Sequence, residues 1–418
     1  MAVKAACKEK YGMAGPLTGV RVLDLTSVLM GPFATQIMGD LGADVIKVEP
    51  TAGDTTRGIG PCRSPGMGSN FIQLNRSKRS LVLDLKTARG RDALLRLART
   101  ADVFVHNVRP QAMARLGLGY DEVRAENPGI VYCSLTGFGE GGRYAGQPAY
   151  DDLVQGLSAL PSLHAGATGE PRYVPTPVVD RVAGLNAALA VSAALVWRAA
   201  SGEGQAVEVP MFETMTQVVL GDHMFGRTFE PPLGPAGYNR LMSPDRRPYR
   251  TRDGWICVLT YTDRHWLSFF ALIGRDDLAA DPRFADMRRR NQHIDELYGL
   301  LAAAMLERTT GDWLAALGEA DIPAGPLHDL DSLIADPHLA DTGFFEVVEH
   351  PSEGAIRSMR VPSRWSRTAP EVTRLAPRLG EHGPGILAEA GFTRAEIEAL
   401  AADGVTVLPE PTARPEPA

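Results

Sequence analysis

The chain has 418 residues, and its 43 Lys and Arg against 50 Asp and Glu give a formal net charge of -7 at pH 7. Hydrophobic residues make up 44% and charged residues 22%, as in ordinary globular proteins, which excludes disorder and low complexity as the general state. The acidic balance argues against nucleic acid or an anionic membrane as the partner. At roughly 100–200 residues per domain, the length predicts two domains, or three if one is small.

Neither metal chemistry nor secretion is indicated by the sequence. Cys7, Cys62, Cys133 and Cys257 stand far apart without a C-x-x-C pair, so we expect no zinc site and no disulfide framework. The N-terminal residues contain no apolar run of roughly 7–15 residues, and no later stretch offers about 18 uninterrupted apolar residues. We therefore expect a cytoplasmic protein without a membrane span and without a metal.

Predicted strands and helices alternate over residues 20–160. Two short apolar runs flank a helix that has Pro32 near its start and Gly42 at its end, which predicts a βαβ unit. The pattern then repeats, and the predicted elements are strand 20–26, helix 32–41, strand 45–49, strand 81–85, helix 89–99, strand 103–106 and strand 130–135. Such alternation predicts an α/β fold with a mostly parallel, doubly wound sheet. Because ligands bind at the carboxyl ends of its strands, we expect the site in the loops after Thr26, Glu49, His106 and Leu135.

The sequence changes in texture after residue 180. Residues 181–200 are apolar on all sides of the predicted helix, which indicates a buried helix. Beyond Val219 the chain becomes turn-rich, aromatic and basic, and predicted helices over 263–273 and 292–306 follow. This change in composition, together with the helices that follow, predicts a second, smaller domain. A strand at 345–348 and a helix at 394–402 then precede a tail rich in Pro and Glu.

Residues 137–142 read GFGEGG and match the G-x-G-x-x-G pattern of dinucleotide sites. The context differs from such a site, because Pro148 follows, no helix opens on the last glycine, and no acidic residue lies about 20 positions later to bind a ribose. A tight loop is therefore favoured. The chain also has no G-x-S-x-G, H-E-x-x-H or P-loop pattern, so the corresponding enzyme classes lose their usual support.

Asp180 allows two interpretations. Just before an apolar helix, its carboxylate suits an N-cap that accepts backbone N–H groups. The same place suits a nucleophile, because the helix dipole and donated N–H groups keep the carboxylate ionised, while Val178, Val179 and Val182 exclude water. Composition alone leaves both interpretations open.

Six collinear blocks of the sequence are PLTGVRVLDLTSVLMGPFATQIMGDLGADVIKVEP, NRSKRSLVLDLKT, ADVFVHNVRPQAMARLGL, NPGIVYCSLTGFGEGG, AYDDLVQGLSAL and PVVDRVAGLNAALA. These blocks resemble the family III CoA-transferases, the CaiB/BaiF family, which includes formyl-CoA and carnitine CoA-transferases and is related to α-methylacyl-CoA racemase. The resemblance implies a Rossmann-like large domain built from both chain ends, a smaller α+β domain between them, and an intertwined homodimer. We accordingly expect 1–222 and 331–405 in the large domain, 223–330 in the small domain, and 406–418 as a disordered tail.

The resemblance also implies site residues. Asp180 to Gly184 matches the D-x-x-x-G element of the family, which makes Asp180 the catalytic carboxylate. Two positions depart from the family: Leu29 stands where formyl-CoA members have Gln, and Pro50 replaces a basic residue that some members place on the nucleotide. The implied coenzyme A contacts are Val28, Leu29, Met30, Leu83, Asp84, Leu85, Lys86, Asn107, Val108, Arg109, Arg115, Tyr150 and Asp151.

The activity that the resemblance implies is transfer of coenzyme A from an acyl-CoA donor to a free carboxylic acid. Asp180 would form an aspartyl anhydride and then an aspartyl-CoA thioester, with coenzyme A as substrate and no permanently bound cofactor or metal. Backbone N–H groups of a turn containing Gly234 and Gly237 would stabilise the oxyanions, unless this is an ordinary turn.

Two other functions stay open. α-Methylacyl-CoA racemase has a His before the Asp that matches Asp151, and here that residue is Tyr150, whose phenol is a weak replacement for imidazole. A coenzyme A-binding protein without catalysis is the other alternative, although a pure binder would not require Asp180. The acceptor acid is not identified by the sequence. Five arginines of the small domain suit the binding of a dicarboxylic acid or of the coenzyme A phosphates, or else belong to an ordinary solvated loop. They are Arg240, Arg246, Arg247, Arg250 and Arg252.

Overall fold

The computed structural model describes residues 15–409, which form two compact units. Within the described residues, the first unit combines 15–157, Pro175–Thr216 and 340–409, and the second combines Ser158–Val174 and Gln217–Leu339. The first unit is thus assembled from both ends of the chain. The limits that the resemblance implies place residues 158–174, 217–222 and 331–339 in the large domain, whereas these residues group with the second unit.

The chain remains ordered at the point where the sequence predicts a disordered tail. Thr406 is buried, and its hydroxyl donates to the carbonyl oxygen of Val82 at 2.7 Å. This hydrogen bond ties the C-terminal segment to the end of a strand, so a tail beginning at residue 406 is wrong. The predicted tail from residue 410 onward, like Cys7, lies outside the described residues.

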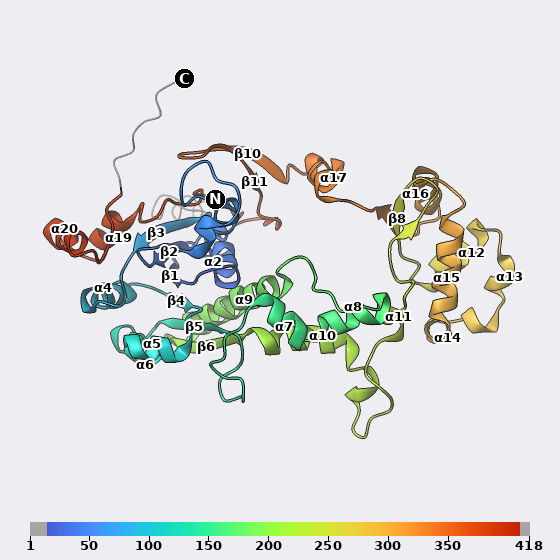
Figure 1. Ribbon diagram of the computed structural model, residues 1–418, viewed down its shortest axis with the longest axis horizontal. Helices are drawn as coiled ribbons and strands as arrows, with labels where there is room; N and C mark the ends of the chain where they lie inside the picture. Colours follow the sequence, from blue (N-terminus) through green and yellow to red (C-terminus); the bar gives the residue numbers. More distant parts are fainter. Residues whose placement is uncertain (1–14, 410–418) are drawn as a thin grey trace. The chain divides into compact units, whose positions relative to one another are not determined.

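A six-stranded parallel sheet forms the centre of the first unit, in the order β3-β2-β1-β4-β5-β6 (Figure 1). This sheet confirms the predicted α/β fold. Because the strand order reverses between β1 and β4, a ligand crevice is expected beside the carboxyl ends of these two strands. The strands are β1 Arg21–Leu25, β2 Asp44–Glu49, β3 Lys78–Val82, β4 Val103–His106, β5 Val131–Thr136 and β6 Gln205–Pro210.

Two strands differ from the sequence prediction for physical reasons. β3 begins at Lys78, whereas the sequence predicts a start at residue 81. The prediction misses the first half of the strand because it carries charged side chains, which are buried and paired in the structure. Lys78 Nζ donates to Asp24 Oδ2 at 3.0 Å and to Asn75 Oδ1 at 2.9 Å. β6 is not predicted at all, since its QAVEVP sequence lies at the sheet edge and is mostly half-buried or exposed. Neither β3, with its buried charges, nor β6, at the sheet edge, has over its whole length the continuous apolar run by which a strand is predicted from sequence.

Helices cover both faces of the sheet. On one face, α2 (Met30–Asp40) and α9 (Val178–Ser201) pack against each other and against the strands. The other face holds a core that includes Leu23, Ile46 and Phe104. The helices around this core are α4 Ala88–Ala98, α5 Pro110–Leu116, α6 Tyr120–Glu126, α19 Gly383–Glu389 and α20 Arg394–Ala402. In Figure 1 the red helix α19 lies beside β3, so the C-terminal segment completes this layer.

Local sequence signals explain where two of these helices begin. The Thr87 hydroxyl accepts the Gly90 N–H at the start of α4, and Thr393 forms a capping box with Glu396 at the start of α20. The remaining elements of the first unit are η1 Thr55–Gly58, α3 Ser69–Leu74, α7 Asp151–Leu157 and the antiparallel hairpin of β10 Phe345–His350 and β11 Gly354–Met359. Two helices run across the limits of the units, namely α10 Met211–His223 and α18 Pro337–Asp341.

The second unit has its own core and its own sheet. Three antiparallel strands pack with short helices around Trp266, Phe269, Leu301 and Trp313. The predicted helices over 263–273 and 292–306 are confirmed as α12 and α15. The elements are α8 Leu160–Thr168, η2 Phe225–Thr228, α11 Asn239–Met242, β7 Tyr249–Arg250, β8 Trp255–Val258, α12 Asp263–Leu272, α13 Asp276–Ala279, η3 Pro282–Phe284, α14 Met287–Gln292, α15 Ile294–Met305, α16 Thr310–Glu319, β9 Ala324–Pro326 and α17 Leu330–Ile334.

Helix α9 is not buried on all sides as its sequence predicts. Val179, Ala187 and Val191 face the core, but Leu189 is 67% exposed and Val196 is 72% exposed. The apolar pattern therefore extends over two sides of this helix, and residues 15–409 cover one of them. Among the described residues, α9 is the one helix that is long and apolar enough to cross a membrane by length and composition. Its packing against α2, β5 and β6 makes it a helix of the core.

The close approach of α9 to α2 depends on Gly184, which predicts a packing defect when a methyl group is added. A Cβ at Gly184 would lie 2.7 Å from the Met30 carbonyl oxygen and 3.1 Å from the Phe33 ring. We expect Gly184→Ala to destabilise the first unit by about 1–3 kcal/mol, because the helices must separate. Gly221→Ala, in an open helical position of α10, is the matched control and should keep or raise the thermal midpoint. Equal midpoints for the two variants would contradict this account.

Candidate active site

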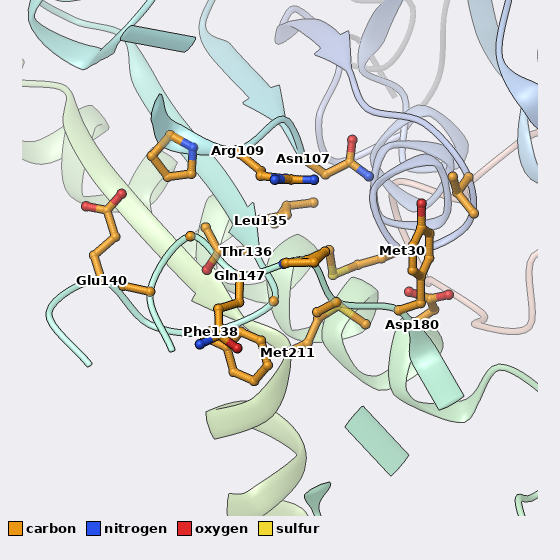
Figure 2. Close-up of a pocket in the computed structure, with 18 of the residues that line it drawn as sticks. Met30, Asn107, Arg109, Leu135, Thr136, Phe138, Glu140, Gln147, Asp180 and Met211 are labelled. Atoms are coloured by element: carbon orange, nitrogen blue, oxygen red, sulfur yellow. The ribbon is translucent and has the colours of Figure 1, made fainter. Parts of the chain in front are cut away.

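A cavity of about 470 Å³ opens at the carboxyl ends of β1, β4 and β5. Figure 2 shows Asn107 and Arg109 along one side of this cavity and Asp180 close to Met30. Three of the four loops predicted to hold the site therefore line it, while the loop after Glu49 does not. The lining residues are Ser27, Val28, Leu29, Met30, Asn107, Arg109, Pro110, Gln111, Leu135, Thr136, Gly137, Phe138, Glu140, Ala145, Gly146, Gln147, Pro148, Ala149, Tyr150, Asp180 and Met211.

A second hollow extends the cavity along the start of α5. It shares Ser27, Asn107, Arg109 and Gln111 with the cavity and reaches Arg115. Within residues 15–409, no carboxylate pairs with Arg109 or Arg115. Two cations without counter-ions in one hollow favour an anionic ligand there.

Asp180 lies inside the first turn of α9 and is not its N-cap. The helix begins at Val178 after Pro177, three residues earlier than the N-cap interpretation requires. The capping role falls to Asp151, whose Oδ2 accepts the Asp180 N–H at 2.9 Å, while Gln155 donates to Asp151 Oδ1 at 2.6 Å. Among the described residues, none donates a hydrogen bond to the carboxylate of Asp180 itself. This carboxylate is therefore free to meet a ligand.

The environment of Asp180 opposes ionisation, contrary to the expectation that the helix start keeps it ionised. Burial, and after it the nearby Asp151 carboxylate, raise the pKa of this carboxyl to about 7, while Arg181 acts in the opposite direction. Arg181 is half-buried, and its guanidinium lies 4.6 Å from the centre of the Phe33 ring. Burial lowers the pKa of Arg181, and Asp180 counteracts this shift. Near neutral pH, Asp180 therefore exists both with and without its proton.

The glycine-rich loop 137–142 is braced by carboxylates and does not form a phosphate cradle. The Gly139 N–H donates to Glu213 Oε1 at 3.0 Å, and the Glu140 N–H donates to Glu208 Oε1 at 2.9 Å. Acidic side chains thus occupy the N–H groups that would otherwise bind an anion. This arrangement agrees with the tight-loop interpretation and explains how β6, which carries Glu208, positions one wall of the cavity.

The structure brings only part of the predicted site together. Seven predicted residues line the cavity, namely Val28, Leu29, Met30, Asn107, Arg109, Tyr150 and Asp180, and Val108 and Arg115 line the second hollow. Asp151, the residue after Tyr150, is buried and accepts a hydrogen bond from the first turn of α9. Four predicted residues at the carboxyl end of β3 line neither space, namely Leu83, Asp84, Leu85 and Lys86.

The predicted oxyanion turn belongs to the second unit. The Gly237 N–H already donates to the His223 carbonyl oxygen at 2.8 Å. Gly237 therefore offers no free N–H in this arrangement, and the oxyanion role of Gly234 stays a prediction.

Several lining residues are not found by sequence reasoning. Gln147 and Pro148 come from the irregular segment before α7, and Met211 comes from the start of α10. The strand-end rule points to Ser27 and Thr136, but no local signal points to Met211, which reaches the cavity through the unpredicted strand β6.

Within residues 15–409, no group of three or more His, Cys, Asp and Glu side chains is placed to hold a metal ion.

Comparison with known proteins gives consistent matches over most of the chain. A family model described as CoA-transferase family III matches residues 17–383. A succinate–glutarate CoA-transferase of Agrobacterium fabrum is 34% identical over 385 residues, covering 90% of this chain and 95% of the relative. A probable fatty acyl-CoA transferase of Mycobacterium tuberculosis is 33% identical, covering 90% and 98%. The crystal structure of a CaiB/BaiF family protein from Brucella suis superposes with a TM-score of 0.75 at 32% identity, covering 90% and 100%.

The raised pKa of Asp180 predicts that this residue destabilises the folded protein at alkaline pH. Because the folded-state pKa lies above the unfolded value, the stabilising contribution is complete below about pH 4 and is lost as the pH rises through about 7. Asp180→Asn should therefore raise the free energy of unfolding at pH 8 by about 1–3 kcal/mol, after allowance for solvent screening, and by less at pH 5. The thermal midpoints of the variant and the wild type at the two pH values measure this difference. Asp152→Asn, at an exposed carboxylate of α7, is the control. A pH-independent difference for Asp180→Asn would contradict the shift.

Proposed function

Because the chain belongs to CoA-transferase family III, we propose that it moves coenzyme A between carboxylic acids with Asp180 as the covalent nucleophile. The family and its named relatives support enzymatic CoA transfer as the activity. The observation that carries the proposal is a half-buried carboxylate, without a hydrogen-bond donor among the described residues, facing a cavity at the switch point of the sheet.

In the first half of the proposed reaction, Asp180 Oδ attacks the thioester carbonyl of the donor acyl-CoA. The C–S bond breaks, the coenzyme A thiolate leaves, and an acyl-aspartyl anhydride forms. The thiolate then attacks the Asp180 carbonyl carbon, which expels the donor acid as its carboxylate and leaves an aspartyl-CoA thioester. Burial of Val179 beside Asp180 limits the water that would hydrolyse the anhydride.

In the second half, the carboxylate of the acceptor acid attacks the aspartyl thioester and expels the thiolate. A new anhydride joins Asp180 to the acceptor, and the thiolate attacks the acceptor carbonyl to give the product acyl-CoA. Asp180 returns to a free carboxylate, so charge and atoms balance without another reactant. A pKa of about 7 suits this role, because Asp180 must act both as nucleophile and as leaving group.

The unpaired cations in the second hollow support the placement of coenzyme A. Arg109 lines the cavity together with Asp180, and Arg115 lines the adjoining hollow, so both cations are available to the phosphates of an extended ligand whose thioester meets Asp180. Asn107 has a different task, because its side-chain amide exchanges two hydrogen bonds with the backbone of Ser27, at 3.0 and 2.8 Å. We propose that Asn107 joins the two loops and that the two arginines contact the phosphates.

Short dicarboxylic acids are the acceptors that we propose to test first. Named relatives transfer coenzyme A to glutarate, mesaconate and citramalate, as their names state, while another is named for fatty acids. The lining groups of Ser27, Thr136 and Gln147 make part of the cavity polar, which favours an acid with a second polar end over a long alkyl chain.

Substitution of Asp180 tests the proposal directly. Asp180→Ala should lower the exchange rate by at least about a thousandfold, because no anhydride can form, while the Kd for coenzyme A changes little. Exchange between succinyl-CoA and a panel of dicarboxylic and fatty acids, together with calorimetric CoA binding, measures both effects. Asp152→Asn serves as the control with full activity. An active Asp180→Ala enzyme would refute the mechanism.

The same assays separate the two alternatives. Deuterium incorporation at the α-carbon of a 2-methylacyl-CoA, without exchange between acids, would establish a racemase. Coenzyme A binding with neither reaction would establish a non-enzymatic binder. Tyr150 is 71% exposed and lines the cavity, so it is placed to contact substrate, but a phenol is a weak replacement for the imidazole that the racemase has at this position.

We also propose that the exposed apolar face of α9 is covered by a second copy of the chain. Leu185, Leu189, Val196 and Trp197 form an apolar row on a helix whose other side is core, and the family resemblance implies an intertwined homodimer. Light scattering after size exclusion should give twice the chain mass, and Leu189→Glu with Val196→Glu should weaken the association. A monomeric wild-type protein at micromolar concentration would contradict this proposal.

A further inference from the structure

The turn after β1 is held by side chains from four other positions in the fold. The Thr26 N–H donates to Asp24 Oδ1 at 2.9 Å, and the Thr26 carbonyl oxygen accepts from Lys47 Nζ at 2.9 Å. Asn107 pairs with both backbone groups of Ser27, and the Val28 N–H donates to Asp54 Oδ1 at 3.3 Å. Each of these backbone groups from Thr26 to Val28 therefore has a side chain as its partner.

Val28 is held in a conformation that its side chain disfavours. Its φ of 69° lies in the left-handed region, which is rare for a β-branched residue and costs about 1–3 kcal/mol. Such a conformation persists only where the surroundings over-determine it. Val28, Leu29 and Met30 line the cavity, and the Met30 carbonyl oxygen lies against Gly184, one turn after Asp180. The strained turn thus sets one wall of the site.

Lys47 and Asp54 are the buried groups that connect this turn to β2. Their side chains are 0% and 1% exposed, and Lys47 Nζ lies 2.9 Å from Asp54 Oδ2. Each also serves the turn, since Lys47 holds the Thr26 carbonyl and Asp54 holds the Val28 N–H. A buried ion pair alone is weak support for stability, because desolvation offsets most of the attraction. The hydrogen bonds to the turn give this pair a second task.

We propose that Lys47 and Asp54 are positioning residues that keep Val28 left-handed and thereby shape the cavity wall for coenzyme A. This inference rests on the proposed function for its ligand. Neither residue touches the cavity, so both act through the backbone of 26–28. The competing explanation is a structural ion pair with no effect on the site beyond general stability.

A double-mutant cycle distinguishes these explanations. Asp54→Asn should raise the Kd for coenzyme A and the KM for the acyl-CoA donor by at least about fivefold, because the Val28 N–H loses a charged acceptor. Val28→Gly permits the left-handed backbone without restraint and should itself weaken binding about two- to threefold, through lost contact. In the Val28→Gly background, Asp54→Asn should add less than twofold. Effects that multiply independently would overturn the proposal.

Two further variants keep the test decisive if Asp54→Asn folds poorly. Asp54→Glu keeps a carboxylate for Lys47 but displaces it from the Val28 N–H, so binding should weaken although the pair with Lys47 keeps its charges. Asp40→Asn breaks another buried pair, Asp40 with Arg76, which makes no contact with residues 26–28. It should lower the thermal midpoint and leave the Kd within twofold.

The outcomes separate this proposal from the proposed function. An unchanged Kd in both Asp54 variants, or an equal loss in Asp40→Asn, would refute the positioning role. If the wild-type protein exchanges no coenzyme A between acids, the proposed function fails. The calorimetric Kd for coenzyme A still decides the role of Lys47 and Asp54 in that case.

Discussion

In the proposed reaction, Asp180 has to lose its proton in a place where burial and the Asp151 carboxylate both oppose ionisation. The two acidic residues are linked by more than charge, because Asp151 accepts the Asp180 N–H and so fixes the first turn of α9. The group that fixes the backbone of Asp180 therefore also weakens the acidity of its carboxyl. The pKa of about 7 that results suits the proposed role, in which the carboxylate both attacks a thioester and leaves from an anhydride. The rest of the first unit serves to maintain this arrangement.

The face of the sheet under α2 contributes buried charge where most sheets place apolar side chains. Asp24, Lys47 and Lys78 are each fully buried on neighbouring strands, and each has partners of opposite charge or backbone carbonyls within about 3 Å. Lys47 holds the turn that leads to the cavity, and Lys78 anchors the Pro32 carbonyl oxygen of α2. α2 in turn packs closely on α9, the helix that carries Asp180. The buried charges therefore link the strand ends to α9 through α2.

Much of the fold could be predicted from the sequence, because it depends on local periodicity. Strand 103–106 and helix 394–402 agree with the structure residue for residue, and the strand-end rule led to three loops of the cavity. The start of β3 and the role of Asp151 could not be predicted, since partners distant in sequence decide both. Lys78 reads as a surface charge until Asp24, 54 residues away, is placed beside it. The exposed side of α9 could not be predicted for a related reason, because an exposed apolar helix face has the same sequence pattern as a buried one.

Isotope transfer from a labelled acceptor tests covalent catalysis by Asp180 most directly. In the proposed reaction, the acceptor carboxylate gives one of its oxygens to Asp180 when the product acyl-CoA forms. After turnover with an ¹⁸O-labelled acid, mass spectrometry should find ¹⁸O in the peptide that contains Asp180, and in no other carboxylate. An active enzyme in which that peptide keeps its natural mass after many turnovers would show that the acyl group never passes through Asp180.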